Sequence, residues 1–261
     1  MADGIGLALS GGAARGIAHA GVLEVFAGEG IPVRAIAGTS AGAIIGALFA
    51  AGVSPREIGR LALETRWLDL FTVRLPRAGL LPGEGLEQFL ERHLPVRTFA
   101  ELRLPFVAVA TDLATGERVD LSAGDLVPAV LASCSVPILL EPVALGGRLL
   151  VDGGISSQLP VRALRVLNGA LPAVAVDVNV GGLDPPRLDS ALHVALHLAM
   201  LWTAGRTREE AGLADALVGV DARGIALHDL AQGPELLRRG RAAARMALPA
   251  IRELLGPPPA R

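Results

Sequence analysis

The sequence predicts an α/β fold with three layers, in which a mostly parallel central sheet carries helices on both faces. Short aliphatic runs alternate with longer helical patterns, and strands separated by helices usually pair in parallel. The chain has 261 residues, 51% hydrophobic and 3% aromatic, a length at which one α/β domain often runs undivided. We therefore expect a single domain over residues 1–255, followed by a Pro-rich tail over residues 256–261.

Two strand–helix pairs are expected at the start of the chain. The first pairs a strand over Ile5–Leu9 with a helix over residues 14–28. The second pairs a strand over residues 33–37 with a helix over residues 41–51. Ser54-Pro55 then opens another helix, because serine is a favoured N-cap and proline fits the first helical turn.

The remaining elements follow the same alternation. Strands are expected over residues 105–110, 118–121, 148–151, 173–178 and 216–220, with a turn at Thr115-Gly116 between the first two. Helices are expected over residues 126–133, 188–210 and 234–255.

The composition excludes several kinds of chemistry. All 24 basic residues are arginine, no tyrosine occurs, and Cys134 is the one cysteine. Schiff-base lysines, phenolic acids and paired-cysteine sites are therefore excluded. A net charge of −2 supplies no basic field for nucleic acid. The longest uncharged run, residues 35–55, reads better as strand, turn and helix than as a membrane span, because glycine recurs through it.

A possible nucleophile lies in Gly38-Thr39-Ser40-Ala41-Gly42, at the junction of a predicted strand and a predicted helix. In this context G-x-S-x-G forms a nucleophile elbow. The glycines remove side chains that would collide around the sharp turn, and the N-terminus of the following helix favours negative charge beside Ser40.

A second glycine-rich segment, Ser10-Gly11-Gly12-Ala13-Ala14-Arg15-Gly16, follows the first strand. A dinucleotide fingerprint would require glycine at position 13. We therefore favour a loop of exposed N–H groups that faces an anion and lies beside Ser40 if the first two strands are neighbours. Arg15 braces this loop, attracts a phosphate or forms a surface ion pair, and the sequence does not choose among these.

Asp152 is the favoured base for Ser40, because it ends an apolar strand and enters the turn Gly153-Gly154. An Asx turn is the structural alternative for this residue. His193 and His197 share one helix face, but no nearby carboxylate completes a metal site. His19 is expected to pack or to brace the loop.

Taken in order, these motifs resemble the patatin-like phospholipase family. The resemblance rests on Gly11-Gly12-Ala13-Ala14-Arg15-Gly16, on the elbow at Ser40, on the block from Ala132-Ser133 to Pro142, and on Asp152-Gly153-Gly154. Further similarity to bacterial members appears in residues 19–23, 159–161 and 214–229, so the resemblance covers nearly the whole chain.

The resemblance implies a serine–aspartate dyad, with Ser40 as nucleophile and Asp152 as its base. Backbone N–H groups around Gly12 and Ala13 would hold the oxyanion, and lipid acyl esters would be hydrolysed without a metal or other cofactor. Two departures stand out. Ala13 replaces a frequent third glycine, which the loop tolerates if this residue avoids positive φ. Residues 137–142 lack the Gly and Phe often found there.

Three other functions stay open at this stage. They are an α/β-hydrolase triad that uses His228, a non-catalytic lipid- or protein-binding domain of the same fold, and a dinucleotide enzyme. Residues 67–81 are expected to border an acyl groove or to form a lid. The N-terminus has no basic region, so we expect a cytoplasmic protein that can contact the inner membrane peripherally. The sequence predicts no oligomeric state.

Overall fold

The computed structural model describes residues 2–70, 81–182 and 191–256. Its centre is a mixed sheet of eight strands in the order β5-β6-β3-β2-β1-β7-β8, with β4 paired to β3. Five of these strands form the parallel part: β1 (Ile5–Leu9), β2 (Val33–Thr39), β3 (Phe106–Asp112), β7 (Ala173–Val180) and β8 (Ala216–Asp221).

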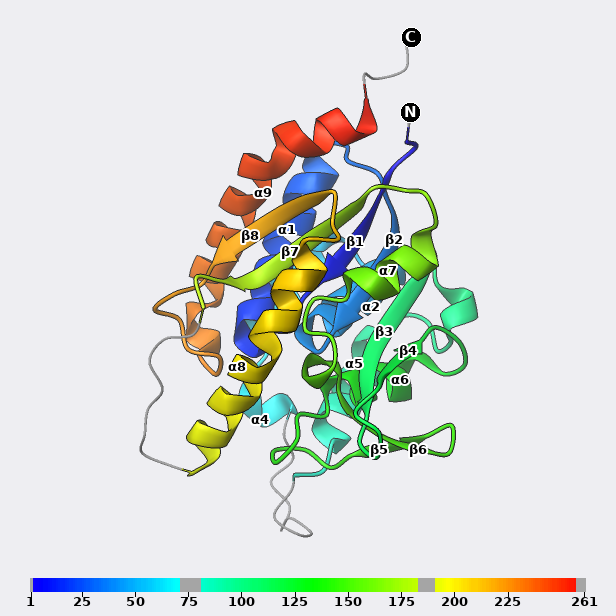
Figure 1. Ribbon diagram of the computed structural model, residues 1–261, viewed down its shortest axis with the longest axis vertical. Helices are drawn as coiled ribbons and strands as arrows, with labels where there is room; N and C mark the ends of the chain where they lie inside the picture. Colours follow the sequence, from blue (N-terminus) through cyan, green and yellow to red (C-terminus); the bar gives the residue numbers. More distant parts are fainter. Residues whose placement is uncertain (1, 71–80, 183–190, 257–261) are drawn as a thin grey trace.

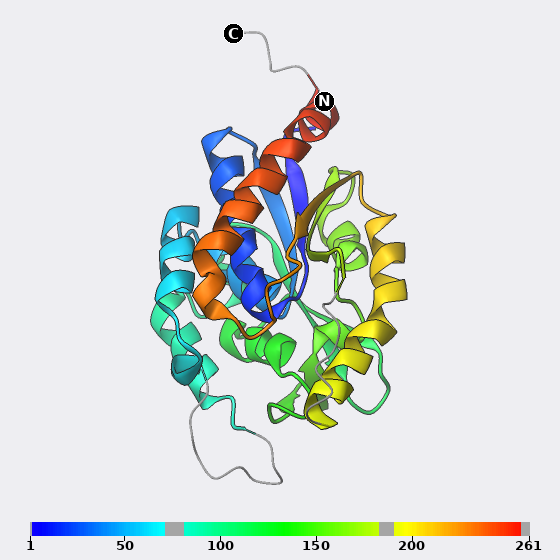
Figure 2. The ribbon, with the colours of Figure 1, turned by 90° about the vertical axis from the view of Figure 1, so that its left-hand side faces the viewer.

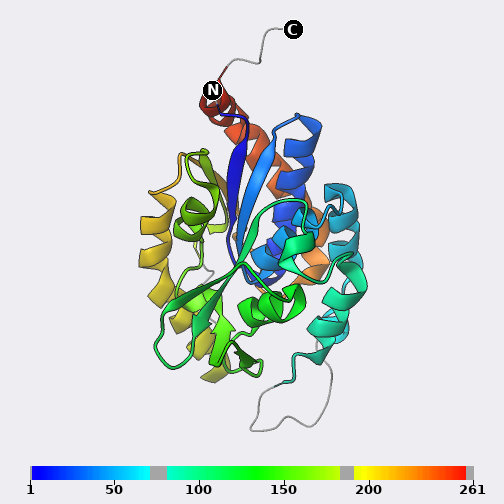
Figure 3. The same cartoon turned by 90° about the vertical axis from the view of Figure 1, so that its right-hand side faces the viewer.

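Helices cover both faces of this sheet, as Figure 2 shows from the side. The expected α/β class with a mostly parallel sheet is thereby confirmed. One face carries α1 (Ile17–Gly28), α2 (Ala41–Ala50), α3 (Pro55–Glu64), α5 (Glu84–His93), α6 (Leu126–Cys134) and α9 (Gly233–Leu255). The other carries α7 (Val161–Asn168) and α8 (Ala191–Ala211) (Figure 3).

Burial explains why the central strands carry so few polar residues. Every residue of β1 and of β3 is buried, as expected for strands covered on both faces. The predicted cap of α3 is also present, since the Glu57 N–H donates to Ser54 Oγ at 3.2 Å.

The sheet is not parallel throughout. The strands β4 (Arg118–Leu121) and β6 (Arg148–Asp152) pair antiparallel with β3, and β5 (Val143–Leu145) pairs antiparallel with β6. The predicted turn at Thr115-Gly116 explains the first pairing, because it returns β4 directly along β3. β6 reaches β3 after a helix and nevertheless runs antiparallel, which the simple alternation did not predict.

Several boundaries differ from those expected. Residues 13–16 form a short 3-10 turn before α1, so the helix begins at Ile17 instead of residue 14. The Ala14 N–H of this turn donates to the Leu227 carbonyl, a contact from far along the chain that the local sequence does not reveal. β2 continues to Thr39 and thus reaches the elbow. Residues 188–190 and 257–261 of the expected helix and tail lie outside the described residues.

The carboxyl ends of the parallel strands all point towards one end of the molecule, opposite the start of β1 and the end of α9 (Figure 1). The short helix α4 (Trp67–Leu70) and the β5–β6 hairpin lie at this end as well. Because β1 and β2 are neighbours, the glycine-rich loop and Ser40 follow adjacent strands there.

Candidate active site

Ser40 sits on a strained turn between β2 and α2. Its φ is 53° and its ψ is −122°, a conformation that residues other than glycine rarely adopt. The surroundings explain the flanking glycines. A Cβ on Gly42 would lie 2.3 Å from the Leu9 carbonyl oxygen, and a Cβ on Gly38 would lie 2.5 Å from the Gly42 carbonyl oxygen. Strain of this kind is typical of functional sites.

The backbone of Ser40 is held by a second serine. Its N–H donates to Ser133 Oγ at 3.0 Å, and Ser133 Oγ donates in turn to the Val109 carbonyl at 2.6 Å. Ser133 is fully buried at the end of α6. The sequence placed Ser133 only within a motif block and suggested no role for it.

Asp152 lies at the end of β6, with its side chain against Ser40. It is 6% exposed, its carboxyl accepts the Gly154 N–H at 2.7 Å, and the Ser40 hydroxyl lies close enough to stabilise its charged form. Burial raises the pKa of Asp152 to about 6, although the Ser40 hydroxyl and the Gly154 N–H oppose the rise. The bond to Gly154 is the Asx turn considered above, so this residue makes the turn and also faces the serine.

The glycine-rich loop presents two free amides. The Gly11 N–H donates to the Gln158 carbonyl, and the Ala14 and Arg15 N–H groups donate to the carbonyls of Leu227 and Gly12. Among the described residues, the N–H groups of Gly12 and Ala13 have no such partner within the chain. These two amides are therefore the unengaged ones of the loop, with Gly12 buried and Ala13 exposed, whereas those of Gly11 and Arg15 are already hydrogen-bonded.

Ala13 adopts positive φ, at 47°. The loop was expected to tolerate alanine at position 13 only if this residue avoids positive φ, and it does not. An L-residue in this region costs about 1–2 kcal/mol, so Ala13 is held by its neighbours instead of by its own preference. The exposed Ala13 also borders Gly16, whose missing side chain leaves room for Ala41.

Arg15 is buried, with 1% exposed. Its Nε donates to the Ile225 carbonyl at 2.9 Å and its Nη1 to the Gly182 carbonyl at 3.2 Å. Of the three roles considered for this residue, these two contacts fit the brace, and its burial does not fit a position at the surface.

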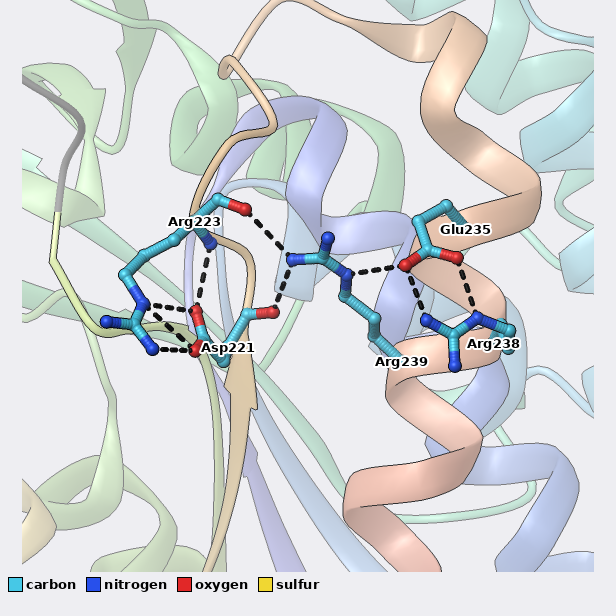
Figure 4. Close-up of polar contacts among 5 residues, drawn as sticks. All are labelled: Asp221, Arg223, Glu235, Arg238 and Arg239. Carbon is cyan, nitrogen blue, oxygen red and sulfur yellow. Dashed lines mark hydrogen bonds and ion pairs between the residues drawn. The ribbon is translucent and has the colours of Figure 1, made fainter.

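The connection that follows β8 supplies acceptors to the glycine-rich loop and is itself tied to α9. Arg239 donates to the carbonyls of Asp221 at 2.8 Å and Arg223 at 3.0 Å, and also bonds Glu235 (Figure 4). Arg223 pairs with the Asp221 carboxylate, and Arg238 pairs with Glu235. This network ties the start of the turn that carries Ile225 and Leu227 to α9.

The structure gives His19 and His228 different surroundings. His19 is buried, its Nε2 donates to the Ser10 carbonyl at 2.8 Å, and burial lowers its pKa to about 4. It therefore braces the loop as a neutral ring. The His228 side chain is exposed, whereas the titratable group beside the Ser40 hydroxyl is the Asp152 carboxyl. The side chains of His193 and His197 lie outside the described part of the structure.

An apolar pocket of about 90 Å³ opens between the loop, the elbow and α3 to α5. Its lining residues are Ala13, Gly16, Ile17, Ala41, Ile44, Ile45, Ile58, Ala62, Thr65, Leu70, Phe89 and Leu230. Leu70 belongs to the segment 67–81 expected to border a groove, of which residues 71–80 lie outside the described ranges.

Over the described ranges, no three His, Cys, Asp or Glu side chains are grouped as a metal site requires. No helix within them has both the length and the apolar character needed to cross a bilayer.

Comparison with known proteins identifies the family. The family model described as "Patatin-like phospholipase" matches residues 7–165, more than half of the chain. An uncharacterized NTE family protein of Mycobacterium tuberculosis is 34% identical over 192 residues, which cover 70% of this chain and 51% of that protein. Patatin-like phospholipase domain-containing protein 7 of Rattus norvegicus is 34% identical over 187 residues, covering 68% of this chain and 14% of that protein. The chain thus spans about half the length of the mycobacterial relative and 14% of the length of the rat protein.

Solved structures share the fold at low sequence identity. VipD from Legionella pneumophila aligns with a TM-score of 0.56 at 14% identity, covering 95% of this chain and 67% of that one. The ExoU–SpcU complex of Pseudomonas aeruginosa contains a chain that aligns with a TM-score of 0.54 at 18% identity, covering 95% and 52%. With the family-model match over residues 7–165, these findings place the chain in the patatin-like phospholipase family.

Proposed function

We propose that this chain is a serine hydrolase that cleaves acyl esters of lipids, in the manner of a phospholipase A or lysophospholipase, through a Ser40–Asp152 dyad. The observation that carries the proposal is the position of the Ser40 hydroxyl, on a strained turn, beside the buried Asp152 carboxyl, whose pKa is raised to about 6. Such a carboxylate is a stronger base than a solvated one and is still deprotonated at neutral pH.

The reaction would proceed in two steps. Ser40 Oγ attacks the ester carbonyl carbon while Asp152 accepts its proton, and the free amides of Gly12 and Ala13 stabilise the oxyanion. The tetrahedral intermediate then expels the alcohol, which takes the proton from Asp152 and leaves an acyl-Ser40. Water attacks the acyl carbon and gives a proton to Asp152, and collapse releases the carboxylic acid and returns the proton to Ser40.

The apolar pocket supports an acyl substrate. It begins at Ala13, Gly16 and Ala41 and continues between isoleucine side chains to Phe89. A hydrocarbon chain bound there would leave its ester carbonyl near Ser40. Because lipids of this kind reside in membranes, we also propose a cytoplasmic enzyme that contacts the inner membrane peripherally, and cosedimentation with phospholipid vesicles tests this contact.

Fluorophosphonate labelling tests the proposal directly. Wild-type protein should label at Ser40, Ser40→Ala should not, and Ser54→Ala should label like the wild type because Ser54 is an exposed helix cap. A panel of phospholipid, lysophospholipid and glyceride esters then defines the substrate. A folded wild-type protein that neither labels nor cleaves any ester would favour the non-catalytic lipid-binding alternative. Loss of activity in His228→Ala would instead favour the triad.

A further inference from the structure

We propose that Glu210, near the end of α8, is a positioning residue for the reaction, because it holds the loop on which the nucleophile, the oxyanion loop and the base all depend. This inference rests on the proposed function. Glu210 is 5% exposed. One of its carboxylate oxygens accepts the Ser157 hydroxyl at 2.9 Å, and the other accepts the Arg162 N–H in the first turn of α7 at 2.8 Å.

The loop held by Glu210, residues 153–158, contacts all three parts of the candidate active site. The Ser157 carbonyl accepts the Thr39 hydroxyl at 2.8 Å, next to Ser40. The Gln158 carbonyl accepts the Gly11 N–H at 3.0 Å, at the start of the oxyanion loop. The Gly154 N–H donates to Asp152 Oδ1 at 2.7 Å. We call residues 153–158 the hub loop.

A carboxylate is well suited to this position. A buried carboxylate is costly unless its oxygens are hydrogen-bonded, and here each oxygen accepts a different donor. The arrangement therefore joins α8, the hub loop and the start of α7 at fixed distances. Ser157 thus has two contacts: its side chain donates to Glu210 of α8, and its carbonyl accepts the Thr39 hydroxyl.

The effect of Glu210 on the reaction would pass through Ser157. Movement of Ser157 would release Thr39 Oγ1, and with it one restraint on the strained turn at Ser40. The same movement would shift Gln158 and Gly154, and thus the Gly11 amide and the Asp152 carboxyl. Small displacements of a nucleophile or its base lower the reaction rate, because the reaction requires the two groups to be aligned.

The test compares Glu210→Gln with Glu209→Gln. Glutamine keeps the size of the side chain but supplies one acceptor oxygen where two are used. With Oε1 on the Arg162 N–H, the Ser157 hydroxyl has to turn and accept from the amide, so weaker neutral hydrogen bonds replace the two charge-assisted ones. Glu209 is the exposed neighbour, and its substitution removes the same charge. We expect Glu210→Gln to label with fluorophosphonate roughly tenfold more slowly or worse. We expect Glu209→Gln to match the wild type.

Two further measurements separate positioning from general stability. Amide hydrogen exchange should accelerate in peptides covering residues 9–16, 36–43 and 150–160 of Glu210→Gln. The acidic limb of the labelling rate should move to higher pH, because a weaker Gly154 bond raises the pKa of Asp152 further. Leu248→Ala, in the core contact of α9, should lower thermal stability without either change.

Unchanged exchange and an unchanged labelling rate in Glu210→Gln would overturn the inference, as would losses no different from those of Leu248→Ala. If Glu210→Gln fails to fold, Ser157→Ala removes the same link from the other side and should give the same changes. If the wild type itself does not label, the proposed function fails. The exchange comparison still decides whether Glu210 holds the hub loop.

Discussion

At the scale of single residues, Asp152 combines two opposing properties. Burial raises its pKa to about 6, which makes it a useful base and also makes its charged form costly in the folded protein. The folded state retains the proton of Asp152 up to about pH 6, whereas an unfolded chain releases it near the ordinary value of 3.8. Stability therefore falls as the pH rises between these two values, by about 3 kcal/mol at most.

Asp152→Asn should consequently lose activity and gain stability. General-base catalysis typically contributes about 10²–10⁴-fold, and the amide cannot accept the Ser40 proton. At pH 8 the variant should be more stable than the wild type by about 1–3 kcal/mol, because it lacks the cost of the buried charge. The difference should shrink as the pH falls towards 4, where Asp152 is protonated.

Thermal or denaturant unfolding at several pH values measures the stability difference, and the wild-type labelling rate should fall about tenfold per pH unit below pH 6. A stability difference that does not change with pH would contradict the assigned pKa. Retention of the acidic limb in Asp152→Asn would contradict the role of this residue as base.

How far the site could be predicted also depends on single residues. Ser40 and Asp152 could be named because each belongs to a short motif at a predicted strand end. Glu210 could not, because its partners Ser157 and Arg162 lie about fifty residues away in the chain and no local pattern marks it. Ser133 likewise acts on Ser40 from 93 residues away.

At the scale of elements, the parallel part of the sheet was predictable because each strand is a short aliphatic run followed by a helix. The helices α5 and α7 were not predicted, since neither has a side chain that caps its N-terminus, and the strand β5 has three residues. The antiparallel course of β6 depends on the path of residues 135–147 and leaves no trace in its own sequence. The elbow itself was predictable, because close approach between α2 and β1 leaves glycine as the one residue that fits at position 42.

Gly42→Ala tests this close packing of α2 against β1. The new Cβ would meet the backbone oxygens of Leu9 at 2.3 Å and Ser10 at 2.6 Å, which cannot move without displacing the strand and the oxyanion loop. We expect labelling to be abolished and stability to fall by about 1–3 kcal/mol. The matched control is Gly28→Ala near the end of α1, where a Cβ meets nothing within 4 Å and should stabilise by about 0.5–1 kcal/mol. Equal behaviour of the two variants in unfolding and labelling experiments would contradict the proposed packing constraint.

At the scale of the whole molecule, the candidate site is assembled from segments spread along most of the chain. The proposed oxyanion loop follows the first strand, the proposed nucleophile the second and the proposed base ends the sixth, while the connection after β8 supplies the carbonyls that hold Ala14 and Arg15. The last helix, α9, is thus coupled to the start of the chain through Arg239. We therefore expect the positions of the Gly12 and Ala13 amides to depend on Arg239, a residue more than 200 positions away in the chain.

Arg239→Met should therefore weaken catalysis from a distance. Methionine keeps much of the aliphatic packing but leaves the carbonyls of Asp221 and Arg223 without the guanidinium, at a cost of about 1–3 kcal/mol. The turn carrying Ile225 and Leu227 should loosen, and fluorophosphonate labelling should slow severalfold. Arg238→Met is the matched control, because this exposed residue pairs with Glu235 on its own helix and a surface pair of this kind contributes about 0–1 kcal/mol. If both variants label at the wild-type rate while Arg239→Met alone is destabilised, α9 stabilises the fold without positioning the oxyanion loop.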